Sequence, residues 1–85
     1  MQYKGKTLSW NIKKDEFLKR KRGVGFEELM NKGVLIDDIE HPTRHDQRIM
    51  LLNYNGYPYS VPYDEWPSTI ELRTLFPNSD YKHLI

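Results

Sequence analysis

Three charged residues have the side-chain types that metal-free cleavage of RNA requires. Such cleavage needs a base for the 2′-hydroxyl proton, a donor for the leaving oxygen and positive charge for the pentavalent phosphate. Glu71 and Arg73 can supply a base and a cation about 6–7 Å apart on one face of a strand. Arg48, expected to face Tyr63 across a hairpin, is a second candidate cation. Ion pairs and polar contacts on a solvated sheet face are the alternative interpretation.

A basic segment at the N-terminus is the second candidate feature. Residues 1–22 carry a charge balance of +6 and residues 23–85 one of −5, although the net charge is only +1. Such a surface can bind nucleic acid or an acidic protein, or it can be a solvated helix face. The candidate RNA- or partner-binding residues are Lys13, Lys14, Lys19, Arg20, Lys21, Arg22 and Lys82.

The histidines and tyrosines offer weaker signals. His41 and His45 are four residues apart, but Pro42 disfavours the helix that would bring them together on a metal, so we expect exposed loop histidines. The chain has no cysteine, and we expect neither a metal nor a cofactor. Tyr54, Tyr57 and Tyr59 alternate along the chain, where they can stack unpaired bases or simply pack on a sheet.

The length and composition limit the architecture. With 85 residues, the chain is expected to form one domain over residues 1–85, and its small core makes a homodimer or a partner protein a reasonable expectation. No apolar run approaches the roughly 20 residues that span a bilayer. The N-terminus also lacks an apolar stretch of signal-peptide length. We therefore expect a cytoplasmic protein with no membrane partner.

Two helices are expected after an opening strand or extended arm at residues 2–10. Asn11 is suited to cap the first helix, which runs to about Arg22 with Phe17 and Leu18 as its apolar stripe and Gly23 at its end. The second helix covers residues 26–32, between Gly25 and Gly33.

The remaining chain has the pattern of strands. We expect them at residues 34–39, 48–54, 57–63 and 69–76, with a type I′ turn at Asn55-Gly56 joining the middle two. Pro58 and Pro62 argue for an edge or a partly paired strand. The tail from Pro77 forms a short helix or packs on the sheet. These elements predict an α+β fold of two layers, with the arm and both helices on an antiparallel sheet of three or four strands.

The motifs resemble, in order, those of the BrnT family of toxins. The first block runs Trp10-Asn11, Lys14, Leu18, then Lys21 to Glu28, and the later one has Ile39 to Pro42, Asn55 to Tyr57, Val61 to Tyr63 and Leu72 to Thr74. The resemblance covers Leu8 to Leu84. It implies a RelE-like fold, a ribonuclease toxin that arrests translation, and a co-encoded DNA-binding antitoxin. Arg73 matches the basic position of the family's last strand.

The sequence departs from the family after that strand. Members typically continue with Ser-Arg or Ala-Arg and further bases, whereas this chain has Asn78-Ser79-Asp80 with Lys82 as its only cation there. Arg22 also stands where the family often has histidine. Three interpretations therefore remain open: a ribonuclease toxin, a catalytically weakened or inactive relative acting as a protein- or nucleic-acid-binding module, and a non-specific nucleic-acid-binding protein.

Overall fold

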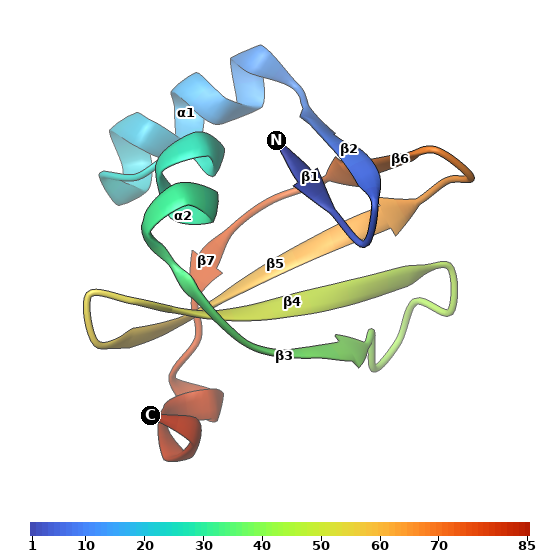
Figure 1. Ribbon diagram of the computed structural model, residues 1–85. Coiled ribbons are helices and arrows are strands. Elements are labelled where there is room, and N and C mark those ends of the chain that lie inside the picture. Colours follow the sequence, from blue (N-terminus) through green and yellow to red (C-terminus); the bar gives the residue numbers. More distant parts are fainter.

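Strands precede and follow a pair of helices in the computed structural model, which describes residues 1–85 (Figure 1). The elements are β1 (Gln2–Tyr3), β2 (Lys6–Trp10), α1 (Ile12–Arg22), α2 (Phe26–Lys32), β3 (Val34–Glu40), β4 (Gln47–Tyr54), β5 (Tyr57–Glu65), β6 (Thr69–Leu72), β7 (Phe76–Pro77) and the 3₁₀ helix η1 (Ser79–Leu84). The predicted α+β class and both predicted helices are confirmed.

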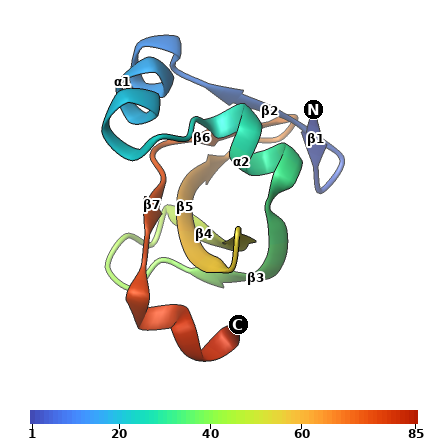
Figure 2. The same ribbon diagram turned by 90° about the vertical axis from the view of Figure 1, so that its left-hand side faces the viewer.

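The sheet is larger than predicted and is not purely antiparallel. Seven strands form it in the order β1-β2-β6-β5-β4-β3, and β7 pairs with β5 beside β6. β2 runs parallel to β6, with Leu8 opposite Ile70. The expected antiparallel sheet of three or four strands was therefore wrong, because the N-terminal segment is a hairpin whose second strand joins the sheet. The sheet curls, so that its strands and α2 surround a common core (Figure 2).

Tight turns join the strands of two hairpins. Asn55 and Gly56 have φ angles of 54° and 80°, which confirms the predicted type I′ geometry. The register also agrees with the prediction, since Arg48 lies opposite Tyr63 and Met50 opposite Val61. Between β1 and β2, Lys4 and Gly5 have φ angles of 55° and 74°. The sequence reading did not anticipate that turn.

β5 is an internal strand, so the edge alternative of the prediction was wrong, whereas the partly paired alternative is confirmed, because Val61 and Pro62 have no ladder partner on one side. β4 lies on one side of it, and β6 and β7 share the other. Pro62 lacks an N–H and falls in the gap between the two partners, where its carbonyl accepts a bond from Arg73 N at 2.9 Å. The predicted strand 69–76 is broken at this gap into β6 and β7. Leu75, between them, turns into the core and is fully buried.

The helices begin and end as predicted, but their packing differs. The Asn11 side chain accepts from Lys14 N at 2.9 Å, and Gly23 ends α1 with φ of 78°. Leu18 is buried, whereas Phe17 is 44% exposed, so the predicted stripe of both residues was wrong. A buried cluster from the helices and strands forms the core: Leu8, Leu18, Val24, Phe26, Leu29, Met50, Leu52, Val61, Tyr63, Ile70, Leu72 and Leu75.

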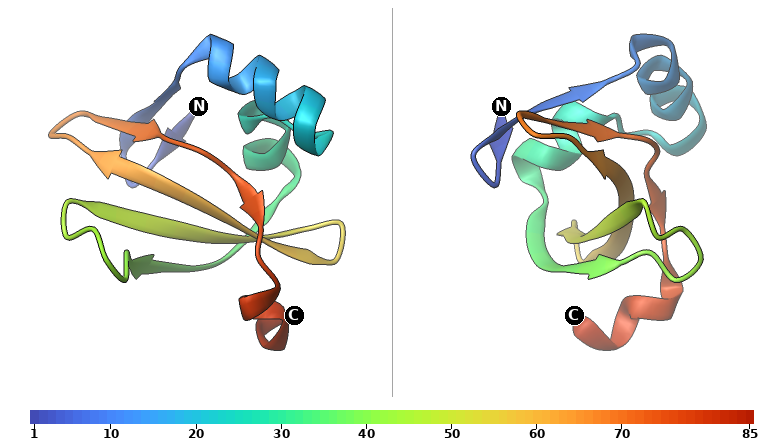
Figure 3. Two further views of the ribbon diagram at one scale, coloured as in Figure 1. Left: turned by 180° about the vertical axis from the view of Figure 1, so that it is seen from behind. Right: turned by 90° about the vertical axis from the view of Figure 1, so that its right-hand side faces the viewer.

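The C-terminal segment extends away from the two helices. From β6 the chain passes through β7 to η1, which lies beyond the sheet at the end of the molecule opposite α1 (Figure 3). η1 confirms the predicted short helix in the tail. This separation determines which of the predicted binding residues can share a ligand.

Candidate functional site

A pocket forms where α1, β2 and β6 meet. β2 and β6 are parallel and end side by side at Trp10 and Leu72, so the first turn of α1 lies next to the residues that follow β6. We call this the β6 pocket; it has a volume of about 280 Å³ and is lined by Asn11, Lys14, Glu71, Leu72 and Arg73. Two of the three predicted catalytic residues, Glu71 and Arg73, therefore lie together, beside a lysine of the basic helix.

Carboxylates surround the Arg73 guanidinium. Its Nη1 lies 3.1 Å from Glu71 Oε2 and 3.5 Å from Asp64 Oδ2. Asp64 and Glu71 are cross-strand neighbours and so project from the same face of the sheet. An RNA phosphate at this site would have to compete with both acids for Arg73.

Arg48 does not join the β6 pocket. It lies in one row with Tyr63 and Leu72 across three strands, and the side chains of the latter two point into the core. Glu71 immediately precedes Leu72 on its strand, so its side chain points to the opposite face. The structure thus divides the predicted catalytic set, with Glu71 and Arg73 on one face and Arg48 on the other.

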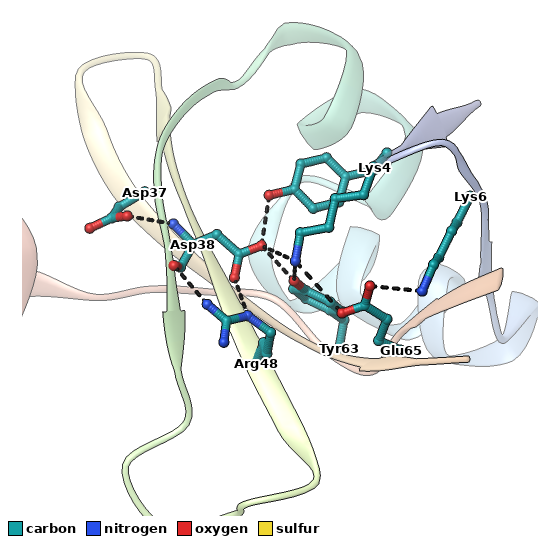
Figure 4. Close-up of polar contacts among 8 residues, drawn as sticks. Lys4, Lys6, Asp37, Asp38, Arg48, Tyr63 and Glu65 are labelled. Atoms are coloured by element: carbon teal, nitrogen blue, oxygen red, sulfur yellow. Dashed lines mark hydrogen bonds and ion pairs between the residues drawn. The ribbon is translucent and has the colours of Figure 1, made fainter. Parts of the chain in front are cut away.

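Arg48 instead binds Asp38, at the centre of a polar cluster (Figure 4). Asp38 Oδ1 accepts from Arg48 Nε at 2.7 Å, and Oδ2 accepts from the hydroxyl groups of Tyr3, at 2.7 Å, and Tyr63. Lys4 Nζ lies 3.3 Å from Asp38 Oδ2 and donates to Tyr63 Oη at 2.9 Å. The cluster joins the β1–β2 turn to β3, β4 and β5.

A β-bulge in β3 directs Asp38 inward. Leu35 pairs with Leu52, but Asp37 pairs with Leu51, so the register shifts by one residue between them. Asp38 then falls opposite Met50, a core residue, whereas an unbroken ladder would place it opposite Ile49. Sequence reasoning missed Asp38, Tyr3 and Lys4, because alternation within residues 34–39 gives no sign of a bulge.

The cluster holds its groups in fixed protonation states. Burial works against ionisation of Asp38, but hydrogen bonds from Tyr63, Tyr3, Arg48 and Lys4 outweigh it and lower the pKa of this carboxyl. Burial, followed by the hydrogen bond to Asp38, raises the pKa of both Tyr3 and Tyr63. The hydrogen bond to Asp38 likewise raises the pKa of Arg48. These groups stay charged or protonated near neutral pH, so the cluster is better suited to structural support than to proton transfer.

A second pocket lies at the turn between β3 and β4. This hairpin pocket also has a volume of about 280 Å³ and is lined by Glu40, His41, Arg44, His45, Gln47 and Arg48. The prediction for the two histidines was incomplete: His45 is exposed, but His41 is half-buried and both line a pocket with two arginines. Sequence reasoning considered the histidines only as metal ligands. No group of three or more His, Asp or Glu side chains is placed to hold a metal ion.

The cations of α1 are mostly free. Within the helix only Lys19 pairs with a carboxylate, that of Asp15. Outside it, Lys4, Lys6, Arg44, Arg48 and Arg73 all pair with acids. Five of the six predicted binding residues on α1 therefore have no anionic partner: Lys13, Lys14, Arg20, Lys21 and Arg22. Lys14 and Lys21 also lie over the exposed Phe17 ring, 5.8 and 5.6 Å from its centroid.

Lys82 and the tyrosine series lie elsewhere. Lys82 belongs to η1, with its Nζ 5.5 Å from the Tyr57 ring centroid, so it is at the end of the molecule opposite α1. Tyr59 packs edge-on against both Tyr54 and Tyr57, at centroid distances of 5.5 and 6.4 Å. The Tyr54 hydroxyl donates to Glu28. These contacts favour the packing interpretation of the tyrosines.

No helix in the structure has the length and apolar character needed to cross a membrane. Comparisons of the chain with family models, curated proteins and solved structures found no match.

Proposed function

We propose that this chain is a cytoplasmic, metal-independent ribonuclease toxin of a type II toxin–antitoxin system, with a RelE-like fold and its cleavage site in the β6 pocket. The observation that carries the proposal is the placement of Lys14, from the basic helix, in one pocket with Glu71 and Arg73. The ordered resemblance of the sequence motifs to BrnT toxins supports the same function. A co-encoded DNA-binding antitoxin is the expected partner.

The chemistry of the pocket is transesterification of an RNA phosphodiester. The Glu71 carboxylate takes the proton of a 2′-hydroxyl, and the 2′-oxygen forms a bond to phosphorus while the bond to the 5′-oxygen breaks. The leaving 5′-oxygen takes a proton from the Lys14 ammonium group, and Arg73 stabilises the charge of the pentavalent phosphate. The products are a 2′,3′-cyclic phosphate and a 5′-hydroxyl end.

The free cations of α1 supply the binding surface for this reaction. They continue from Lys14 along the helix, so an RNA strand bound along α1 would place a phosphate at the β6 pocket. An acidic segment of an antitoxin would bind the same cations and exclude RNA. The expected antitoxin gene lies next to this one, and its co-expression should restore growth.

A second candidate function is favoured by the surroundings of Arg73. Asp64 and Glu71 hold its guanidinium between them, and the tail supplies no replacement cation because Lys82 lies at the far end of the molecule. A module that binds RNA or a partner protein without cleaving RNA fits this arrangement.

A cleavage assay with purified protein tests the ribonuclease. The intact chain should cut single-stranded RNA in the presence of a chelator, leaving cyclic phosphate ends. Glu71→Gln should lower the rate about 10²–10⁴-fold, because it removes the base. Arg73→Gln should lower it about 10²–10³-fold, because it removes charge stabilisation. Both variants should also relieve the growth arrest caused by expression in bacteria.

Lys32→Gln is the matched control, since this exposed lysine on α2 has no ion pair and lies outside the β6 pocket. It should cleave RNA as the unaltered chain does. Bound but uncut RNA at every protein ratio would rule out the ribonuclease and support the binding module. Cleavage that survives both pocket substitutions would contradict the proposed site.

A further inference from the structure

The hairpin pocket is a concentration of hydrogen-bond donors that the proposed cleavage site does not use. Its lining holds two arginines, two histidines, a glutamine and one carboxylate, with no apolar side chain. It lies on the loop between β3 and β4, whereas the β6 pocket lies at the ends of β2 and β6. Its chemistry can therefore be considered on its own.

The arginines keep free donors in this pocket. Arg48 uses Nε and Nη2 to bind Asp38, through the carboxylate at 2.7 Å and the backbone oxygen at 3.0 Å, which leaves Nη1 without a hydrogen bond. Arg44 is 60% exposed, and its one contact with Asp46 is 4.0 Å long. Most N–H donors of the Arg44 guanidinium group are thus available to a ligand.

The loop also orients His41. Its Nδ1 accepts backbone N–H groups from Thr43 at 3.2 Å and Arg44 at 3.1 Å. The neutral ring must then carry its proton on Nε2, which becomes a donor. Gln47 N donates to Arg44 O at 3.2 Å, which closes the loop and fixes Arg44 close to the histidine.

We propose that the hairpin pocket binds a phosphate group, either as free phosphate or as the terminal phosphate of a larger molecule. The anionic oxygens of a phosphate accept hydrogen bonds, which matches the donors of Arg44, Arg48 and His41. The lining contains no apolar side chain, so its polar groups recognise the anion.

One carboxylate in the lining opposes this binding. Glu40 lies opposite Arg48 in the β3–β4 ladder, but it is exposed and forms no ion pair. Within the lining, two guanidinium groups therefore face a single carboxylate, while Asp38 and Asp46 pair with Arg48 and Arg44 from outside it. The free N–H donors of the arginines, and not an excess of charge, favour an anion, and the proposal does not depend on RNA cleavage at the β6 pocket.

NMR titration of the intact protein tests the site. Inorganic phosphate should cause saturable shifts of the backbone amides of residues 41–47 (except Pro42), and chloride at the same ionic strength should not. A 5′-mononucleotide is titrated in parallel: equal affinity indicates that the pocket reads the phosphate alone, and tighter binding indicates a terminal phosphate as its natural target. Both results support the proposal.

Substitutions in and outside the hairpin pocket test where phosphate binds. Arg44→Gln should weaken phosphate affinity about tenfold or more, since it removes charge-assisted hydrogen bonds. Arg44 is the better test than Arg48, because Arg48 also supports the Asp38 cluster. Lys32→Gln should leave the affinity unchanged. The proposal fails if the amides of residues 41–47 show no saturable shift with phosphate, or if chloride reproduces the shifts. It also fails if the Arg44→Gln protein binds phosphate as tightly as the unaltered protein. Phosphate shifts confined to the β6 pocket would contradict this site while supporting the cleavage site.

Discussion

Asp38 shows how a single carboxylate can hold distant strands together. Its side chain is 13% exposed and accepts hydrogen bonds from β1, β4 and β5. Without Asp38, the two tyrosine hydroxyls would lose their shared acceptor, and Arg48 and Lys4 would lose their closest anionic partner. The cost of removing it is therefore larger than that of an exposed ion pair.

Asp38→Asn should lower the free energy of unfolding at neutral pH by about 1–3 kcal/mol, since the charge-assisted bonds are lost. The pKa of Asp38 is lowered in the folded protein. Its contribution is therefore complete above the pKa of an unfolded aspartate, about 3.9, and is lost as the pH falls through the lower folded value. Denaturant unfolding at several pH values should show the gap between the two proteins closing in acid.

Asp46→Asn provides the control, because the Asp46 side chain is 74% exposed and pairs only loosely with Arg44. Its effect on stability should stay within about 0.5 kcal/mol. Equal stability of Asp38→Asn and the unaltered protein at neutral pH would show that the cluster contributes nothing to folding.

At the scale of elements, the junction between α1 and α2 depends on one buried side chain. Asp15 Oδ1 accepts from Phe26 N at 2.7 Å, while Oδ2 lies 3.3 Å from Lys19 Nζ. Asp15 therefore caps α2 from the neighbouring helix, and Gly25 supplies the close approach that this requires. The glycine is needed for space and not for a positive φ angle, since its φ is −106°.

Gly25→Ala should lower the free energy of unfolding by about 1–3 kcal/mol, because the added methyl group overpacks the junction. Its Cβ would lie 2.5 Å from Asp15 Oδ1 and 2.7 Å from Lys19 Cε. Thermal and denaturant unfolding measure the effect, with Asn31→Ala on the exposed side of α2 as the comparison. A Gly25→Ala protein as stable as the Asn31→Ala protein would mean that the helices adjust freely at this point.

The elements that the sequence predicted correctly are those determined by capping and turn residues next to them in the chain. Asn11 and Gly23 bounded α1 correctly, and Asn55-Gly56 set the β4–β5 register, because each acts on its immediate neighbours. The bulge before Asp38 and the break after Leu72 depend on strands far along the chain. The spacing of Glu71 and Arg73 along the chain was enough to predict that the two residues lie together. Their position beside Lys14 follows from the parallel β2–β6 pair, which no local pattern indicates.

At the scale of the whole molecule, the charge asymmetry of the sequence becomes a difference between α1 and the rest of the chain. The acid-rich remainder neutralises most of the bases outside α1, so the excess positive charge stays on one helix. The β6 pocket lies at the start of that helix. Binding of a polyanion should therefore be dominated by α1.

RNA affinity should fall steeply with salt, because each neutralised phosphate of a single strand contributes about −0.7 to the slope of log affinity against log salt concentration. Three to five contacts along α1 correspond to a slope of about −2 to −3.5. The double variant Lys13→Gln, Arg20→Gln should reduce the slope by about 1.4, and Lys32→Gln should not. Fluorescence anisotropy with a labelled oligonucleotide measures this; a flat dependence would exclude phosphate binding by α1.

The parallel pairing of β2 with β6 also has a consequence in time. Ser9 on β2 hydrogen-bonds to Ile70 on β6, 61 positions later. A ribosome delivers β2 well before β6, the strand that covers its edge. Until then Leu8 has no place in a closed core and the β2 edge has no neighbour other than β1. The sheet therefore closes only once β6 has been synthesised, and until then the edge of β2 that faces β6 stays unpaired.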